Sequence, residues 1–195
     1  YYASFLNKGI HPIVPRHGSV GEADVTCLAY VGLAMIGEGE VIFRGKRQSA
    51  LDALADAKLK PLALGPRDGL ALVGSNAFAA GPGTLVCHDA LQLIDMADIV
   101  YALSLEGFRG SLAPLDLATH GLRPFWGQAV SARRVTDLLI GSYLHDLPAP
   151  PRIQDPLSYR VATQVHGAAR DVANNLAKQM AIQLNSSEDN PCVLV

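Results

Sequence analysis

The sequence predicts a mainly α-helical chain with glycine- and proline-rich loops and one short β-hairpin. Apolar residues recur every three or four positions through several long segments, which is the period of a helix that buries one face. Of the 195 residues, 49% are hydrophobic and only 17% are charged, a low charged share for a free-standing globular domain. We therefore expect helices that bury apolar faces against one another and against other chains.

The first predicted elements are a buried helix and a hairpin. Residues 25–36 are apolar almost all round and are followed by Gly37, as is typical of a buried helix with glycine at its C-terminal end. Residues 40–47 place two β-branched residues before Gly45, which favours two short strands joined by a turn. This hairpin is the one piece of β-structure in the predicted fold.

The remaining predicted elements are helices. Ser49, with Asp52 three residues later, has the pattern of a helix N-terminus, and apolar residues follow it at helical spacing. Length and periodicity predict a long buried helix over residues 84–105 and another helix over residues 131–144. The clearest pattern covers residues 161–184, where an apolar face and a moderately polar face predict an amphipathic helix.

Four loops rich in glycine and proline separate these elements. They are GIHPIVPRHGSVG (9–21), LGPRDGL (64–70), AAGPG (79–83) and LPAPPRIQDP (147–156). Binding and catalytic residues concentrate in loops that a rigid frame holds in place. We therefore expect the functional residues in or beside these loops.

Charge and cysteine content argue against several classes of protein. The formal net charge is −2 with both signs scattered, so the sequence favours no nucleic-acid partner. Cys27, Cys87 and Cys192 are odd in number and far apart, which predicts reduced thiols in a cytoplasmic protein rather than disulfides. The histidines share no metal-ligand spacing with nearby carboxylates, so we expect no metal.

We expect neither a membrane-spanning helix nor a signal peptide. The stretch that comes closest to a span, residues 85–105, is interrupted by one histidine and three aspartates, whereas a span needs about 18 or more apolar residues. The sequence has no initiator methionine, and it opens and closes on residues that belong inside structural elements. We interpret residues 1–195 as an internal portion of a longer protein.

Six motifs occur in order along almost the whole chain. They are LNKGIHPIVPRHGSVG (6–21), IGEGEV (36–41), GLAL (69–72), LEGFRGSLAPLDLATHGLRPFWGQ (105–128), RIQDPLSYRVATQVHGAARD (152–171) and QLNSSEDNP (183–191). Together they resemble the histidine and phenylalanine ammonia-lyase superfamily. The resemblance implies the central helical bundle of the ammonia-lyase (fumarase/aspartase-like) fold, as part of a single lyase domain. It also implies a homotetramer whose active sites combine several subunits.

Members of that superfamily eliminate ammonia from an aromatic amino acid and leave an α,β-unsaturated acid. The resemblance implies an electrophilic methylidene-imidazolone ring, made by cyclising an Ala-Ser-Gly tripeptide whose serine loses water. Here the matching place reads Gly21-Glu22-Ala23-Asp24. Between the glycine and the aspartate stand two residues where the family has three, and neither of them is serine. Because the ring needs that serine, we expect no methylidene-imidazolone cofactor.

The resemblance also assigns substrate-binding residues. Arg160 matches the arginine that binds the substrate carboxylate, and its guanidinium can give that planar group two charge-assisted hydrogen bonds. Gln154, Gln164 and Asn190 match further family positions, whereas the family's tyrosine falls on Leu157 here. Tyr159, two residues beyond it, is also expected to bind the substrate. The expected ligand is thus a small amino acid or its betaine.

Two residues are expected to be catalytic. Glu22 stands in the place of the electrophile, where a carboxylate suits a cationic substrate group or acts as a base. Asn76 lies two positions beyond the place of an asparagine that the family sets against the ring. The tyrosine that serves the family as general base falls before Tyr1.

Structural alternatives exist for three of these residues. Arg160 could form an ion pair with Asp155. Glu22 could be an ordinary carboxylate at the start of the following helix, where negative charge is favoured. Tyr159 could be a packed aromatic residue.

Three functions remain open. The first is a lyase that does not need the ring, because a quaternary ammonium, as in an amino acid betaine, departs readily; the superfamily includes ergothionase-like enzymes of this kind. The second is a conventional histidine or aromatic amino acid ammonia-lyase, against which the missing serine counts. The third is a non-catalytic homologue, against which the retained Arg160 counts. The coordinated changes in the motifs favour the first.

Overall fold

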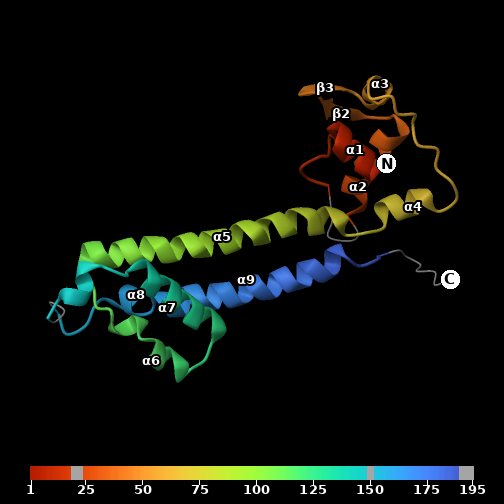
Figure 1. The fold of residues 1–195 in the computed structure, drawn as a ribbon. Coiled ribbons are helices and arrows are strands. Elements are labelled where there is room, and N and C mark those ends of the chain that lie inside the picture. The colour runs from red at the N-terminus through yellow and green to blue at the C-terminus, as the bar shows by residue number, and fades with distance from the viewer. Residues whose placement is uncertain (19–23, 149–151, 189–195) are drawn as a thin grey trace. The chain divides into compact units, whose positions relative to one another are not determined.

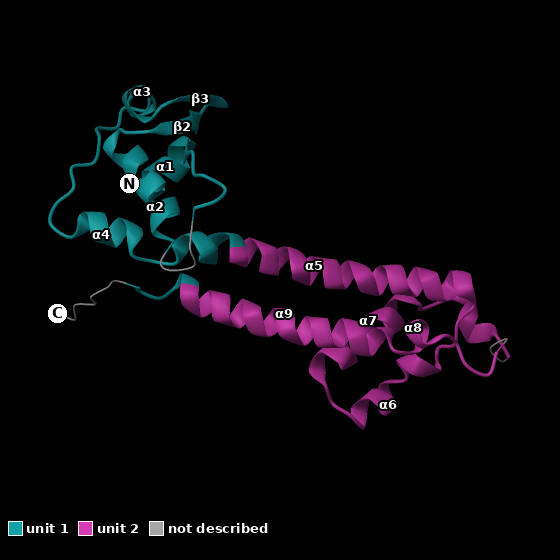
Figure 2. Ribbon diagram, turned by 180° about the vertical axis from the view of Figure 1, so that it is seen from behind, with its two compact units in different colours: residues 1–82, 184–195 teal, residues 83–183 magenta. Residues whose placement is uncertain are grey.

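The computed structural model describes residues 1–18, 24–148 and 152–188. The chain forms two compact units, coloured separately in Figure 2. Unit 1 comprises residues 1–82 and 184–195, and unit 2 comprises residues 83–183. Each unit contains a cluster of buried apolar residues of its own.

Unit 1 contains a small antiparallel sheet together with short helices (Figure 1). Its elements are α1 (Tyr2–Lys8), β1 (Ile10–Pro12), α2 (Val25–Ile36), β2 (Glu40–Phe43), β3 (Lys46–Ser49), α3 (Ala50–Asp56) and α4 (Asp68–Val73). The strand order is β1-β2-β3, with Ile10 opposite Phe43 and Val41 opposite Gln48. The predicted hairpin is confirmed, whereas β1 was not predicted because three residues are too few to show an alternating pattern.

Three local predictions in unit 1 are confirmed. Helix α2 covers the predicted residues and ends where Gly37 takes a φ of 90°, a left-handed conformation that glycine adopts without a steric penalty. Arg44 and Gly45 both have positive φ in the hairpin turn, as suits the twist of the paired strands. The Ser49 hydroxyl accepts a hydrogen bond from the Asp52 backbone N–H at 3.1 Å and so caps α3.

The core of unit 1 is apolar. Ile10, Met35, Val41 and Leu54 are each at most 2% exposed, and they come from β1, α2, β2 and α3. Burial alternates along β2, as the pleat requires, so Val41 faces the core while its neighbours in the strand are exposed. Packing of apolar side chains between sheet and helices therefore holds this unit together.

Unit 2 is a helical bundle. Its elements are α5 (Ala77–Phe108), η1 (Ala113–Leu115), α6 (Leu117–Gly121), α7 (Trp126–Leu138), η2 (Tyr143–Asp146), α8 (Leu157–Arg160) and α9 (Ala162–Leu184), where the first turns of α5 and the last residue of α9 belong to unit 1. Helices α5 and α9 lie side by side in both views (Figures 1 and 2), and the Cys87 thiol donates to the Ala173 carbonyl between them. A Cβ on Gly127 of α7 would clash with the Gly167 carbonyl oxygen of α9, so only glycine permits this approach. The predicted mainly α-helical fold is confirmed.

Some predicted boundaries are wrong. Helix α5 begins at Ala77, so the AAGPG motif (79–83) is part of a helix rather than a loop. Pro82 within it lacks a backbone N–H and so removes one helical hydrogen bond. Helix α7 ends at Leu138, six residues early, because Gly141 takes a φ of 79° that a helix cannot continue through. The last predicted helix is confirmed as α9.

The prediction that α5 is buried holds only for one of its faces in this chain. Leu93 and Leu103 are 69% and 65% exposed, whereas Leu105 is fully buried. By length and composition alone, the helical stretch Asp68–Phe108 is also apolar enough to cross a membrane, which the sequence did not predict. Core helices of soluble proteins meet the same criterion. Within unit 2, Asp98 of α5 forms an ion pair with Arg170 and a hydrogen bond with His166 of α9.

Within residues 1–18, 24–148 and 152–188, neither the cysteines nor the metal-binding side chains form a further site. Cys27 and Cys87 are buried free thiols, and Cys192 lies outside the described residues. Among residues that the structure describes, no three histidine, cysteine, aspartate or glutamate side chains come together as metal ligands would.

Candidate active site

Three motif segments meet at the N-terminal end of α5, all within unit 1. The Asp24 carboxylate, which ends the GSVGEAD stretch, accepts a hydrogen bond from the Ala79 backbone N–H at 2.8 Å. The Glu188 carboxylate, from the SSED stretch, accepts one from the Asn76 backbone N–H at 3.0 Å. Unpaired N–H groups and the helix dipole favour carboxylates at a helix N-terminus. This helix end thus gathers segments that are far apart in the sequence.

Asn76 lies immediately before the first turn of α5. Its carbonyl accepts from the N–H groups of Ala79 and Ala80 at 3.0 and 2.9 Å, and its side chain is exposed. A hollow of about 170 Å³ in this unit is lined by Ala71, Gly74, Ser75 and Glu188. The position of Asn76 is compatible with the expected catalytic role but does not test it.

Glu22 and Asn190 lie outside the described residues. Their expected catalytic and substrate-binding roles therefore stay predictions. The described residues nearest to them in the chain, Asp24 and Glu188, both bind backbone N–H groups at the N-terminal end of α5.

Arg160 is the last residue of α8, in unit 2, and its guanidinium is held at one end. Its Nε donates to the Asp155 carbonyl oxygen at 2.9 Å. The Asp155 carboxylate instead binds Arg152 Nη1 at 3.1 Å and the Ser111 backbone N–H at 2.6 Å. Among the described residues Arg160 therefore has no carboxylate partner, and the alternative of an Arg160–Asp155 ion pair is wrong. Its two terminal nitrogens have the geometry to take a planar carboxylate.

The other predicted substrate-binding residues of unit 2 lie on the same stretch of chain. Gln154 is exposed in the loop before α8, and the Gln164 side chain accepts a hydrogen bond from the Thr163 hydroxyl at 3.0 Å. The Tyr159 ring stacks on Phe108, with centroids 4.3 Å apart and planes 14° apart. This stack is the aromatic packing that the structural alternative for Tyr159 describes.

Behind this stretch a buried charge cluster joins α5, α7 and α9. Asp98 is fully buried, and its carboxylate binds Arg170 Nη2 at 2.7 Å, His166 Nδ1 at 2.9 Å and Arg134 Nε at 3.3 Å. Arg170 Nη1 also binds Asp95 at 2.6 Å. Because these groups pair with one another around the buried Asp98 and Arg170, we interpret the cluster as fixing the helices rather than offering a ligand site.

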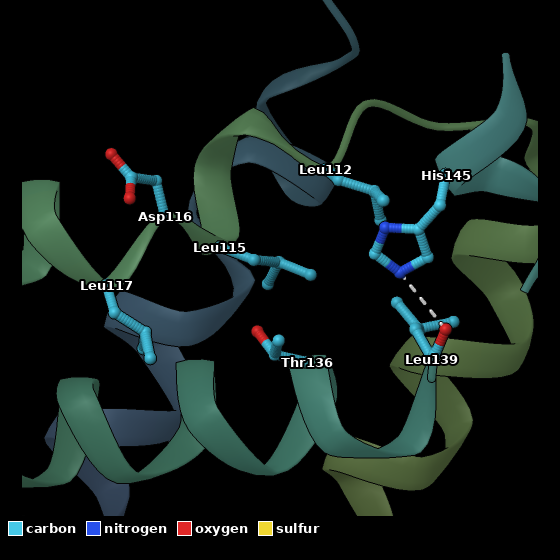
Figure 3. Close-up of a pocket in the computed structure, with 7 residues that line it drawn as sticks. All are labelled: Leu112, Leu115, Asp116, Leu117, Thr136, Leu139 and His145. Carbon is cyan, nitrogen blue, oxygen red and sulfur yellow. Dashed lines mark hydrogen bonds between the residues drawn. The ribbon is translucent and has the colours of Figure 1, made fainter. Parts of the chain in front are cut away.

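A larger pocket in unit 2 does not contain the expected chemistry (Figure 3). It has a volume of about 350 Å³ and is lined by Leu112, Leu115, Asp116, Leu117, Thr136, Leu139 and His145. Its polar groups are already hydrogen-bonded within unit 2: Thr136 to the Ala132 carbonyl, His145 to the Leu139 carbonyl, and Asp116 to Thr119. Hydrogen bonds from the Thr119 hydroxyl and from the Ala118 backbone N–H lower the pKa of Asp116. The pocket is therefore an apolar hollow between helices.

Several residues that shape these sites were not predicted from sequence. Asp24 and Glu188 are acidic residues close to Glu22 and Asn190 in the sequence. Their preference for a helix N-terminus could have been used to place them if the start of α5 had been predicted correctly. Phe108 follows Tyr101 by seven residues on α5, a spacing that puts both on one face, but nothing in the sequence pairs them with Tyr159. Such long-range partners become visible only in the fold.

The sequence matches known proteins along its whole length. Residues 1–195 match the family model described as aromatic amino acid lyase. The histidine ammonia-lyase of Alkaliphilus metalliredigens is 37% identical over 191 residues, covering 97% of this chain and 38% of that protein. A probable histidine ammonia-lyase of Halobacterium salinarum is 40% identical over 190 residues, covering 96% and 36%. This chain thus spans less than two-fifths of the length of these curated relatives.

The fold matches solved structures to the same extent. Ergothionase from Treponema denticola, an ergothioneine-degrading enzyme in complex with desmethyl-ergothioneine sulfonic acid, gives a TM-score of 0.92 at 38% identity, covering 99% of this chain and 39% of that one. The phenylalanine aminomutase of Pantoea agglomerans gives 0.89 at 29% identity, covering 96% and 39%. Similarity in sequence and similarity in fold therefore extend over the same residues.

Proposed function

This chain belongs to the aromatic amino acid lyase family, and we propose that the full-length protein is a carbon–nitrogen lyase that works without a methylidene-imidazolone ring. It eliminates an amine from an aromatic amino acid or its betaine and leaves an α,β-unsaturated acid. The observation that carries the proposal is the loop Gly21-Glu22-Ala23-Asp24, which has no serine to dehydrate. The residues present do not fit the ring, so no step passes through it.

Arg160 is the proposed clamp for the substrate carboxylate. Its Nε is occupied by the Asp155 carbonyl, while among the described residues no carboxylate occupies the terminal nitrogens. Two parallel charge-assisted hydrogen bonds from that edge fix both the position and the plane of a carboxylate. The exposed side chains of Gln154 and Gln164, on the same stretch of chain, are proposed to complete the substrate-binding surface.

Elimination without the ring requires a good leaving group. A base removes the β-proton, the C–H electron pair becomes the C=C π bond, and the Cα–N bond breaks to release the amine. A trimethylammonium group suits this step because it has no N–H proton to lose and departs as neutral trimethylamine. Glu22 is proposed to stabilise that cationic group, and Asn76 to contact the substrate nearby. The similar ergothionase, which degrades ergothioneine, supports a betaine substrate.

A conventional histidine ammonia-lyase is the second candidate. The observation that favours it is the naming of the curated relatives, which are histidine ammonia-lyases at 36% to 40% identity. That activity depends on an electrophile that activates an ordinary amino group, and the sequence of the loop does not provide one. A non-catalytic homologue is the remaining outcome of the test below.

A homotetramer and a cytoplasmic location complete the proposal. The exposed apolar residues of α5, such as Leu93 and Leu103, support burial against further parts of an assembly. The free thiols of Cys27 and Cys87 are compatible with a reducing compartment.

The experiment is a product assay on the full-length protein. Histidine, tyrosine and their trimethylammonium betaines are supplied separately, and ammonia, trimethylamine and the unsaturated acid are measured, with near-ultraviolet absorbance of the ring as a parallel reading. We expect trimethylamine with an equal amount of unsaturated acid, and no ring absorbance. Ammonia release together with ring absorbance would support the second candidate, and no turnover of any substrate would favour the non-catalytic homologue.

A further inference from the structure

We propose that Tyr101, on α5, is a positioning residue that holds Arg160 in the orientation needed for the substrate carboxylate. The inference rests on the proposed function, because it concerns how the Arg160 clamp is held. Three sets of contacts in unit 2 carry it. Tyr101 binds the backbone of Tyr159, α5 holds the ring of Tyr159, and Asp155 holds the Arg160 side chain.

The backbone contact is a hydrogen bond from Tyr101 to the residue before Arg160. The Tyr101 hydroxyl donates to the Tyr159 carbonyl at 2.6 Å. Helix α8 is a single turn, Leu157–Arg160, and a helix cannot satisfy its last carbonyl groups by its own hydrogen bonds. Tyr101 is itself held in place, since it is 7% exposed and its ring meets His166 edge-on at 6.1 Å. The end of α8 is therefore attached to a buried, fixed donor.

The ring contact comes from the next part of α5. Phe108 stacks on Tyr159 at 4.3 Å, and the Arg152 guanidinium lies 3.8 Å from the centre of the Phe108 ring. Tyr101 lies tilted against the same Tyr159 ring at 6.4 Å. Both the carbonyl and the ring of Tyr159 are therefore held by α5, which restricts rotation of the backbone that leads into Arg160.

The side-chain contact fixes the guanidinium itself. Arg160 Nε donates to the Asp155 carbonyl at 2.9 Å, and the buried Asp155 carboxylate is locked by Ser111 and Arg152. With its backbone and its Nε both held, the guanidinium has little freedom left to lose on binding a carboxylate. Tyr101 supplies the backbone half of this arrangement.

The protonation of Tyr101 is consistent with a permanent donor. Burial, followed by the negative charge of Asp155, raises the pKa of the Tyr101 hydroxyl to about 12. The hydroxyl therefore keeps its proton, and its hydrogen bond to Tyr159, throughout the pH range in which a lyase is assayed.

The test compares Tyr101→Phe with Tyr143→Phe in the full-length protein. Tyr143 is a matched control, because its hydroxyl also donates at 2.6 Å to a backbone carbonyl, but to that of Glu106 on α5 rather than to the residue before Arg160. Each variant is assayed with the amino acid or betaine that the parent uses and with its methyl ester, which lacks the carboxylate. Binding of the unsaturated acid is measured by calorimetry as a readout independent of turnover.

We expect Tyr101→Phe to raise KM for the acid, and Kd for the unsaturated acid, by about 3- to 10-fold, the loss typical of one hydrogen bond. Turnover number and ester kinetics should stay within about twofold of the parent, and Tyr143→Phe should match the parent throughout. A parent-like Tyr101→Phe would overturn the inference, and so would equal losses with acid and ester.

Arg160→Gln separates failure of the inference from failure of the proposed function. If Arg160→Gln weakens acid binding and Tyr101→Phe does not, only the positioning role of Tyr101 is overturned. If Arg160→Gln binds the acid as the parent does, the carboxylate clamp is overturned and the positioning role falls with it.

Discussion

The two units stabilise their cores by different physical means. Unit 1 packs apolar side chains such as Val41 and Leu54 between a small sheet and its helices. Unit 2 also has an apolar cluster, but its long helices are joined by the fully buried Asp98 with Arg170 and His166 around it. An apolar core loses stability roughly in proportion to the volume removed. A buried ion cluster is instead sensitive to each single charge, because removing one leaves its buried partners short of a counter-charge.

The candidate functional residues of the two units are also held by different groups. In unit 1, carboxylates of Asp24 and Glu188 reach backbone N–H groups at the start of α5. In unit 2, Arg160 is held by a backbone carbonyl and by a neighbouring residue that is stacked and hydrogen-bonded to α5. Arg160, the proposed substrate clamp, is thus held both through its own Nε and through the residue that precedes it.

The largest effect is expected for Asp98→Ala in unit 2. The change leaves Arg170, 6% exposed, without one of its carboxylate partners, and losing one member of a buried ion pair costs about 3–5 kcal/mol. The denaturant midpoint of the full-length protein measures it. Asp95→Ala is the matched control, because Asp95 also binds Arg170 but is half-exposed, and its loss should be clearly smaller. Equal losses would contradict a special role for the buried carboxylate.

Leu54→Ala tests the apolar core of unit 1. Leu54 is fully buried, and its truncation should lower the free energy of unfolding by about 2–4 kcal/mol through lost burial and a residual cavity. Leu51→Ala, on the same helix but 54% exposed, should change it by less than about 0.5 kcal/mol. Thermal or urea unfolding measures both. A loss below about 1 kcal/mol for Leu54→Ala would contradict an apolar core that depends on filled volume.

Alkaline pH should destabilise unit 2 through Tyr101. Its pKa is about 12 in the folded protein and about 10 in an unfolded chain. Between those values the unfolded chain binds fewer protons than the folded one, so stability falls as pH rises. The stabilisation is complete below pH ~10 and lost by pH ~12, amounting to about 2–3 kcal/mol. Unfolding midpoints of the parent should fall more steeply over this range than those of Tyr101→Phe; parallel curves would contradict the burial of this hydroxyl.

The smallest expected effect is at the anchor of the altered loop. Asp24→Ala removes the acceptor for the Ala79 N–H, and loss of such a contact at a helix N-terminus costs about 1 kcal/mol. Asp24→Asn should restore most of the stability, because asparagine keeps a side-chain oxygen and tolerates the positive φ of 44° found at this position. Thermal unfolding of the three proteins checks the order. An asparagine variant as unstable as the alanine variant would show that charge, rather than the hydrogen bond, matters here.

Local patterns predicted much of this fold. Three local predictions are confirmed: the helix end at Gly37, the cap at Ser49 and the long amphipathic helix α9. Each depends only on residues that are neighbours in the sequence. The AAGPG motif misled because Pro82 is a helix breaker by propensity, yet it lies inside the first two turns of α5. The predicted helix over 131–144 ran too far because its apolar residues continue past Gly141 into a separate short turn.

The site was predictable only as far as the motifs reach. Arg160, Gln154 and Gln164 were assigned by their motif, and the structure places them on one stretch. What holds Arg160 could not be predicted, because the backbone carbonyl of Asp155 and the stack on Phe108 depend on segments that meet only after folding. The sequence also allowed an ion pair between Arg160 and Asp155 as an alternative to substrate binding, but the Asp155 carboxylate pairs with Arg152 instead.

We propose that this lyase scaffold works without a self-made electrophile. The most direct test of this claim is the rate of trimethylamine release from histidine betaine by the full-length protein, measured before and after treatment with sodium borohydride, which reduces the exocyclic double bond of a methylidene-imidazolone. We predict the same rate before and after treatment. Loss of amine release after borohydride would show that an electrophilic ring takes part and would contradict the claim.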